Sequence, residues 1–199
     1  MIPARLVLAT ANPGKVSELG ALVREWGPVE VTTLAAFPTV RLRPEGAGSY
    51  EENARAKAAA VAGAAGLPAL ADDSGLEVEA LDGGPGVVSA RYGGPGLSDE
   101  ERIARLLAAL AAAPGRGRRA RFRCVVALAW PDGRVATAEG QCAGTIAPAA
   151  RGVGGFGYDP VFVADDLCCT FAEAPAAAKD RVSHRARAVR ALGERLRRS

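Results

Sequence analysis

The sequence LPALADDSGL, residues 67–76, holds a short apolar run that ends in two carboxylates, a hydroxyl group and a glycine. Such a run predicts a strand that crosses a sheet and places Asp72 and Asp73 at its end, where α/β proteins tend to keep their chemistry. Two carboxylates there can hold Mg²⁺ and position a water molecule, because hard cations bind oxygen ligands. An Asx-type turn between two strands explains the same residues equally well. The rest of the chain decides between the two interpretations.

The length and composition of the chain indicate one domain. It has 199 residues, 49% of them hydrophobic, which is enough for one sizeable domain and too few for two ordinary ones. The net charge is only +3, and residues 181–199 hold seven Arg against one Glu. The longest uncharged stretch, residues 58–71, is too short to cross a bilayer, and the amino terminus lacks the apolar core of a signal peptide. We therefore expect a single domain over residues 1–199, located in the cytoplasm, with no membrane segment.

Cysteine, histidine and lysine are all scarce. The four cysteines show no CxxC spacing, and the single histidine, His184, cannot complete a Cys₂His₂ zinc site, so we expect reduced thiols and no structural zinc. Only three of the 25 basic residues are lysines, and each falls in a segment with other signs of function: Lys15, Lys57 and Lys179.

The first candidate ligand site is the loop TANPGK, residues 10–15, between a predicted strand and a helix predicted to run to Trp26. The start of a helix offers free backbone N–H groups and the positive end of the helix dipole, both of which suit a phosphate. Lys15 would add a full charge, and Thr10 and Asn12 would add side-chain hydrogen bonds. The loop lacks the Walker A pattern, so an ordinary helix start with Pro-Gly is the alternative.

A third carboxylate precedes the next predicted helix, which covers residues 49–65. Ser49 and Glu52 form a capping-box pattern at its start, and this pattern explains Glu52. Glu45, in the irregular segment 38–48, has no such structural duty. It is therefore the better candidate for a further metal ligand, with a solvated loop glutamate as the alternative.

Sequence patterns in the middle of the chain predict strands and a helix with structural roles. Residues 29–34 predict a second strand, and residues 76–81 predict a continuation of the sheet after the Asp pair. A capping box at Ser98 opens a helix with an apolar face. Residues 122–130 and 135–141 predict two strands of a hairpin.

A glycine-rich segment, GVGGFGYDPVF, occupies residues 152–162. Its glycines let the backbone approach a ligand closely, an aromatic ring can stack on a flat base, and Asp159 can accept hydrogen bonds. The alternative is a glycine-rich turn whose aromatic residues fill the core.

The last predicted helix begins at SHRA, residues 183–186. Ser183 can cap this helix, which leaves His184 and Arg185 in its first turn, where positive charge is not favoured by the helix dipole. An anionic or carbonyl-bearing ligand would explain them. We interpret the Arg-rich outer face as a solvated surface, because no aromatic residues interleave with its charges.

The segments TANPGK, ADDSG, GGFGYDPVF and SHRA, in this order, resemble the inosine triphosphate pyrophosphatase family, the non-canonical purine nucleoside triphosphate (dITP/XTP) pyrophosphatases. The resemblance extends from the first strand to the last helix. It implies an α/β fold: a single elongated domain with a central mixed β-sheet flanked by helices, and two lobes around an active-site cleft. It also implies a homodimer and the Mg²⁺-dependent hydrolysis of ITP, dITP and XTP to monophosphate and pyrophosphate, which cleanses the nucleotide pool.

The resemblance also assigns roles to residues. It makes Asp73 the proton acceptor and a Mg²⁺ ligand, with Glu45 as the second carboxylate and Asp72 in support. It assigns the triphosphate to Thr10, Asn12, Gly14, Lys15, Lys57 and Ser74. It assigns the base and sugar to Phe156, Gly157, Tyr158, Asp159, Lys179, His184 and Arg185. The segment RPEGAG around Glu45 is less acidic than the family's usual run, which leaves the second metal ligand open between Glu45 and Asp72.

Base selection can be argued from hydrogen bonding. If His184 or Arg185 donates to a purine 6-oxo group, ATP presents an amino donor there, and both that amino group and the side-chain donor are left unpaired, at a cost that supports strong selectivity. Rejection of GTP must involve the 2-position, and no residue in the sequence explains it. Three alternatives are a pyrophosphatase for other modified nucleotides, a nucleic-acid-binding module that uses the Arg-rich helix, and a catalytically silent nucleotide sensor. The main interpretation requires neither nucleic acid nor membrane as a partner.

Overall fold

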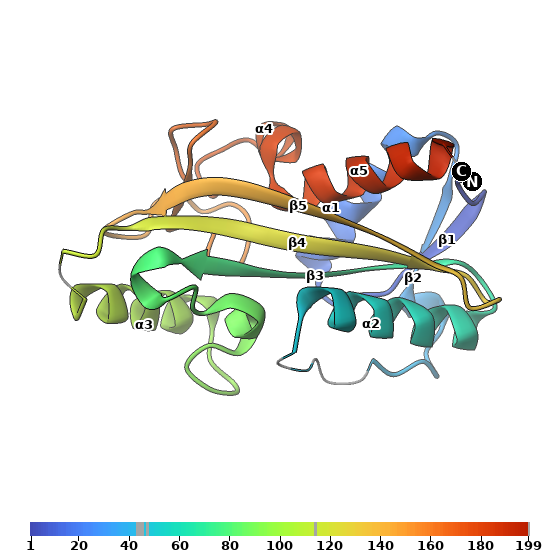
Figure 1. Ribbon diagram of the computed structural model, residues 1–199, viewed down its shortest axis with the longest axis horizontal. Coiled ribbons are helices and arrows are strands. Elements are labelled where there is room, and N and C mark those ends of the chain that lie inside the picture. Colours follow the sequence, from blue (N-terminus) through green and yellow to red (C-terminus); the bar gives the residue numbers. More distant parts are fainter. Residues whose placement is uncertain (43–45, 47, 114, 199) are drawn as a thin grey trace. The chain divides into compact units, whose positions relative to one another are not determined.

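The fold is α/β, as predicted, with a six-stranded mixed sheet of strand order β2-β1-β3-β4-β5-β6 (Figure 1). The computed structural model describes residues 1–42, 46, 48–113 and 115–198. Strand β1 runs parallel to β2 and β3, whereas β6 runs antiparallel to β5. The strands are β1 (Arg5–Leu8), β2 (Glu30–Thr33), β3 (Ala69–Val78), β4 (Arg119–Ala129), β5 (Val135–Ile146) and β6 (Phe162–Ala164). The α-helices are α1 (Pro13–Val23), α2 (Tyr50–Ala65), α3 (Asp99–Ala111), α4 (Ala176–Val182) and α5 (His184–Arg198).

The residues group into two compact units. Unit 1 comprises residues 1–73, 124–140 and 184–199, and unit 2 comprises residues 74–123 and 141–183. Strands β3, β4 and β5 contribute residues to both units. Each unit buries a hydrophobic core of its own.

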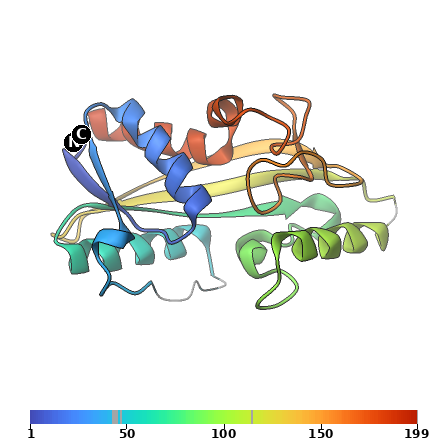
Figure 2. The same cartoon turned by 180° about the vertical axis from the view of Figure 1, so that it is seen from behind.

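Unit 1 is layered. Helices α1 and α5 pack together on one face of its strands, and α2 lies on the opposite face (Figures 1 and 2). Leu70 of β3 belongs to the core cluster that contains Leu22 of α1 and Leu192 of α5. Because side chains alternate along a strand, Asp72 must share the face of Leu70, and Asp73 must face α2.

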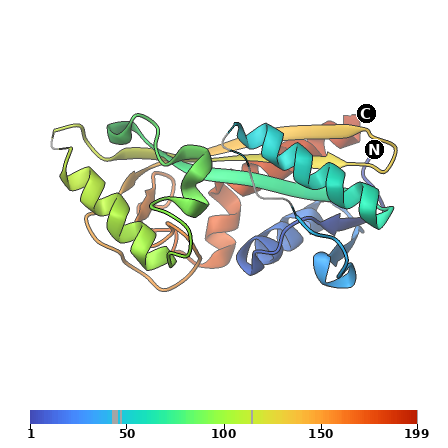
Figure 3. The ribbon, with the colours of Figure 1, turned by 90° about the horizontal axis from the view of Figure 1, so that it is seen from below.

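Unit 2 has an aromatic core. The rings of Phe122 and Phe162 have centroids 4.6 Å apart, and those of Phe162 and Phe171 are 5.1 Å apart. Helix α3, shown in yellow-green in Figure 3, contributes Ile103 and Leu106 to the same cluster. These tilted ring pairs are among the geometries that aromatic side chains prefer.

The helix starts confirm Ser49 and Ser98 as capping residues. Oγ of Ser49 accepts a hydrogen bond from N of Glu52 at 3.1 Å at the start of α2. Ser98 and Glu101 form a complete capping box at the start of α3, with bonds of 3.2 and 2.7 Å. These bonds satisfy backbone N–H groups that have no partner within the helix, so the local sequence fixes where each helix begins.

The prediction for residues 67–76 is wrong in one respect. Strand β3 runs through the acidic pair to Val78, so Asp72 and Asp73 lie inside the strand and not at its end. Residues 79–81 form a 3-10 helix rather than a further strand. Carboxylates are tolerated in the middle of this strand because the helices on both faces supply cationic or hydrogen-bonding partners for them.

Two general expectations concern membranes and disulfides. Across the described ranges, no helix is both long and apolar enough to cross a membrane. No disulfide joins the four cysteines, all of which lie in the described part of the chain. Burial raises the pKa of Cys124 to about 12, so this thiol stays protonated at neutral pH.

Candidate active site

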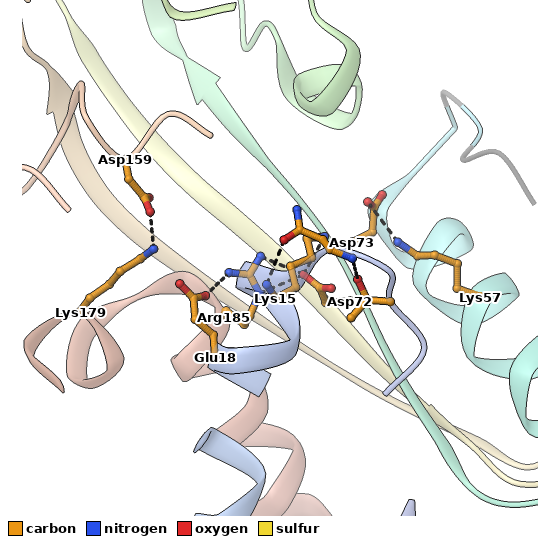
Figure 4. A network of polar contacts seen from close by, with 10 residues as sticks. Lys15, Glu18, Lys57, Asp72, Asp73, Asp159, Lys179 and Arg185 are labelled. Atoms are coloured by element: carbon orange, nitrogen blue, oxygen red, sulfur yellow. Dashed lines mark hydrogen bonds and ion pairs between the residues drawn. The ribbon is translucent and has the colours of Figure 1, made fainter. Parts of the chain in front are cut away.

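Asp72 is the centre of a buried ion-pair network in unit 1 (Figure 4). Its Oδ2 lies 3.0 Å from Nζ of Lys15 and accepts hydrogen bonds of 3.0 Å from Nε and Nη2 of Arg185. Nη1 of Arg185 donates to Glu18. Asp72 and Arg185 are each 1% exposed, and burying such charges is tolerable only when they are paired. The network therefore ties β3 to α1 and to the first turn of α5.

These contacts set the protonation of the network. Burial by itself raises the pKa of Asp72, but the charges of Lys15, Arg185 and Lys57 outweigh it and hold the pKa well below its usual range. Burial likewise lowers the pKa of Arg185, and the charges of Asp72 and Glu18 outweigh it and raise the pKa above its usual range. Asp72 and Arg185 are consequently both ionised at neutral pH.

Asp73 faces α2 on the other side of the strand. Nδ2 of Asn53 donates to Oδ2 of Asp73 at 2.8 Å, and Nζ of Lys57 lies 3.7 Å from Oδ1. Asn53 and Lys57 are four residues apart and therefore share one face of α2. Asp73 is only 2% exposed. Its carboxylate is thus held by a neutral donor on one oxygen and approached by a cation on the other.

The loop before α1 has the features of an anion site. N of Asn12 donates to Oγ1 of Thr10 at 3.2 Å, and Oδ1 of Asn12 accepts from N of Lys15 at 3.1 Å as the helix cap. The first turn of α1, which contains Gly14, carries no acidic residue. A hollow of about 790 Å³ opens beside the loop and is lined in part by Thr10 and Pro13. Helix-start N–H groups and a nearby lysine are an arrangement that favours phosphate.

The glycine-rich loop of unit 2 surrounds a second buried ion pair. Oδ2 of Asp159 accepts a hydrogen bond from N of Phe156 at 2.9 Å and pairs with Nζ of Lys179 (Figure 4). That Nζ lies 5.0 Å from the ring centroid of Phe156 and 5.3 Å from that of Phe171, within the range of cation–π attraction. A flat ring beside a fixed acceptor and a fixed cation can recognise a polar aromatic ligand.

Two further residues of this loop have structural contacts. The hydroxyl of Tyr158 donates to O of Ser89 at 3.0 Å, and burial raises the pKa of Tyr158 above its usual range. N of Gly157 donates to Oδ2 of Asp99 at 2.7 Å. A pocket of about 540 Å³ lies between the loop and α3 and is lined in part by Asp99, Phe156 and Gly157.

The carboxylates of this site can be compared with the ligands that a divalent cation requires. Among the residues described, no group of three or more His, Cys, Asp or Glu side chains could hold a metal ion. Mg²⁺, however, is often bound by one or two carboxylates and completes its shell with water and phosphate oxygens. Asp73 supplies such a carboxylate, whereas Oδ2 of Asp72 is bound by two cationic side chains. Glu45 lies outside the described residues. The donor set therefore fits a cation shared with a phosphate ligand.

Comparison with known proteins identifies the chain. A sequence model described as the Ham1 family matches residues 6–195. This chain belongs to the Ham1 family. A dITP/XTP pyrophosphatase of Geobacter sulfurreducens is 47% identical over 192 residues, which cover 96% of each chain. A dITP/XTP pyrophosphatase of Thermus thermophilus is 51% identical over 192 residues, which cover 96% of this chain and 90% of the relative.

The Ham1 assignment extends to three-dimensional structure. A solved HAM1 protein from Coxiella burnetii superposes with a TM-score of 0.87 at 38% sequence identity, covering 99% of this chain and 100% of that one. The resemblance inferred from four sequence segments is therefore confirmed, and so is the α/β fold that it implied.

Most residues predicted for the Ham1 site fall into local groups. Unit 1 brings together Lys15, Asp72 and Arg185 on one face of β3, and Lys57 and Asp73 on the other. In unit 2, Asp159 and Lys179 form a pair beside Phe156. Ser74 follows Asp73 within β3, and His184 is buried at the start of α5. The roles assigned to these residues stay predictions.

Sequence reasoning missed three residues that hold these groups in place. Glu18 binds Arg185, Asn53 binds Asp73, and Asp99 binds the backbone at Gly157. Helical spacing was the available signal for two of them, because Glu18 follows Lys15 by three residues and Asn53 precedes Lys57 by four. No comparable signal in the sequence links Asp99 to the glycine-rich loop.

Proposed function

We propose that this Ham1 protein is a nucleoside triphosphate pyrophosphatase that hydrolyses ITP, dITP and XTP to the monophosphate and pyrophosphate. The observation that carries the proposal is the buried carboxylate of Asp73, which is held by Asn53 and approached by Lys57. The residue before it in β3, Asp72, pairs with Lys15. The family assignment and the names of the two relatives support the same activity.

The residues of unit 1 account for the chemistry. We assign proton transfer from the attacking water to Asp73, since a general base must be a fixed acceptor within hydrogen-bond reach of that water. Lys15, Lys57 and the N–H groups at the start of α1 bind the triphosphate. They stabilise the charge that develops on the pyrophosphate leaving group while water attacks the α-phosphorus. Asp72 acts in support by fixing Lys15 and Arg185.

We propose Mg²⁺ as the cofactor, held by Asp73 with Glu45 as the second carboxylate. When bound there, the ion neutralises charge on the phosphate oxygens. The chemistry of the Asp73 oxygens supports the assignment, since hard cations prefer carboxylate and phosphate ligands.

Unit 2 and the start of α5 supply the residues for the base and sugar. We assign stacking on the base to Phe156 and polar contacts to Asp159 and Lys179. His184 is favoured over Arg185 as the donor to the purine 6-oxo group, because the guanidinium of Arg185 is bound by Asp72 and Glu18. A site built around such a donor rejects a 6-amino base because its buried polar group would be left unpaired.

The test is a substrate panel. The purified protein is incubated with Mg²⁺ and inosine, xanthosine, adenosine, guanosine or thymidine triphosphate, and products are identified as pyrophosphate or orthophosphate. We expect pyrophosphate from the inosine and xanthosine nucleotides and little product from the others. Equal cleavage of all five would contradict the base assignments, and the absence of cleavage would contradict the activity.

We propose a homodimeric assembly, which the family resemblance implies, and a cytoplasmic location. Light scattering during size-exclusion chromatography measures the first, and fractionation of the source cells measures the second.

For the alternative of a nucleic-acid-binding module, α5 offers little support. Its Arg190 and Arg197 bond to Glu25, and its Arg195 donates to O of Thr137, so intramolecular contacts account for much of its charge.

A further inference from the structure

Asn53 makes polar contacts with two separate parts of unit 1. Its Nδ2 donates to Oδ2 of Asp73 at 2.8 Å and to O of Gly46 at 3.2 Å, while its Oδ1 accepts from N of Gly46 at 2.9 Å. The side chain is 8% exposed, so these bonds form largely away from water. A buried amide with this many partners is fixed in one orientation.

The bonding pattern specifies an asparagine. The backbone N–H of Gly46 requires an acceptor, whereas the carboxylate of Asp73 and the carbonyl of Gly46 both require a donor. Only a side-chain amide combines these functions within the length of one short side chain. An aspartate in the same place would retain the acceptor for Gly46 but would set a second carboxylate against Asp73.

We propose that Asn53 is a positioning residue for Asp73: it fixes the carboxylate so that one oxygen is bound to α2 and the carboxylate keeps one orientation for the reaction. The inference rests on the proposed function of Asp73. None of the groups that we assign to the phosphates or the base is Asn53. Its removal should therefore lower turnover through Asp73 and leave nucleotide affinity nearly unchanged.

The main experiment compares Asn53→Ala and Asn53→Asp with the wild type in inosine triphosphate hydrolysis. We expect kcat to fall about 10–100-fold in both variants, the range found when a residue that orients a functional ligand is removed. At saturating Mg²⁺ we expect KM to change less than about threefold, because the contacts that bind the nucleotide are retained. Asn53→Asp preserves the volume of the side chain and one bond to Gly46, so it covers the case in which Asn53→Ala folds poorly.

Ser49→Ala is the matched control on the same helix. It removes the cap of α2 without touching Asp73, and should lower Tm by about 2–4 °C while leaving kcat unchanged. If Ser49→Ala and Asn53→Ala lose the same fraction of kcat, Asn53 acts only through helix stability, and the proposal is overturned.

A cycle with Asp73→Asn tests whether Asn53 acts through Asp73. If it does, adding Asn53→Ala to Asp73→Asn should lower the residual kcat by less than about twofold, because the group being positioned is already lost. If Asn53→Ala lowers kcat by the same factor in the Asp73→Asn background as in the wild type, the proposal is contradicted.

A measurement independent of turnover uses Mn²⁺ binding followed by electron paramagnetic resonance, in the presence of a non-hydrolysable inosine triphosphate analogue. We expect Mn²⁺ affinity to fall about tenfold or more in Asn53→Ala, because the orientation of its carboxylate ligand is lost. Unchanged affinity together with unchanged kcat would refute the role of Asn53. Failure of the wild type to hydrolyse the nucleotide would instead refute the proposed function, so the two failures are distinguishable.

Discussion

At the scale of single residues, Asp72 and Asp73 are neighbours in sequence but differ in environment. Side chains alternate between the two faces of β3, so Asp72 contacts two cationic side chains on one face. Asp73 contacts one amide and one lysine on the other face. The sequence alone identifies both carboxylates as functional candidates. It does not separate their roles, because the partners come from helices distant in the chain.

Replacement of Asp73 by Asn tests its role as the base. The amide keeps the size of the side chain but cannot accept the proton, so we expect kcat to fall roughly 10²–10⁴-fold with an unchanged circular dichroism spectrum. Near-normal turnover in the folded variant would exclude Asp73 as the proton acceptor.

Gly155 occupies a position where no larger residue fits, a restriction that the sequence alone does not reveal. It has φ +73°, and an added Cβ would lie 2.0 Å from Oδ2 of Asp159. Gly155→Ala should therefore displace the Asp159–Lys179 pair and raise KM for inosine triphosphate at least about tenfold, the equivalent of about 1.4 kcal/mol.

Gly133→Ala is the matched control for this prediction. Gly133 also has a positive φ, of +90°, but has no atom within 4 Å of the added Cβ. Both variants should lose about 1–2 kcal/mol of stability from backbone strain, and only Gly155→Ala should raise KM. Equal KM values in the two variants would contradict a binding role for the Asp159–Lys179 pair.

At the scale of elements, sequence patterns locate the long helices well and the strands less well. Caps and apolar stripes predict α2, α3 and α5 because those signals are local. Strand β3 is longer than predicted because its charged residues find partners only in the folded chain. The three-residue β6 and the seven-residue α4 are missed because they are too short for a periodic pattern.

A surface ion pair between Glu25 and Arg190 links the 3-10 helix after α1 to α5. Nε and Nη2 of Arg190 donate to the two oxygens of Glu25 at 2.7 and 2.8 Å, and these hydrogen bonds lower the pKa of Glu25. Because the Glu25 side chain is 44% exposed, solvent screening limits the contribution to at most about 1 kcal/mol.

The pair predicts a pH-dependent stability difference. A lowered folded-state pKa gives stability that is fully present above the unfolded value of about 4.3 and is lost as pH falls through the folded value. Chemical denaturation at pH 7 should therefore show Glu25→Gln to be less stable than wild type, with a difference that shrinks below about pH 4. A constant difference from pH 7 to pH 3 would contradict the electrostatic origin.

At the scale of the whole molecule, three strands contribute residues to both units, and the chain crosses between the units a fourth time at residues 183–184. We therefore predict one cooperative unfolding transition for residues 1–199. Fluorescence of Trp26 and Trp130 reports on unit 1, and pulsed hydrogen exchange of the peptide 99–111 reports on unit 2. Coincident midpoints are expected. Separate midpoints would show that the units unfold independently.

The family and its fold could be predicted from four short segments, because those segments hold the residues with distinctive chemistry. The contacts of Asn53, Glu18 and Asp99 could not, because they depend on which side chains meet after folding. Glu45, predicted as the second metal carboxylate, lies outside the described residues and stays a prediction.

In the mechanism that we propose, water attacks the α-phosphorus of the nucleotide. Hydrolysis of inosine triphosphate in water enriched in ¹⁸O, followed by mass spectrometry of both products, shows which phosphorus the water attacks. We expect one ¹⁸O atom in inosine monophosphate and none in pyrophosphate. Label in pyrophosphate, or release of orthophosphate as the first product, would contradict it.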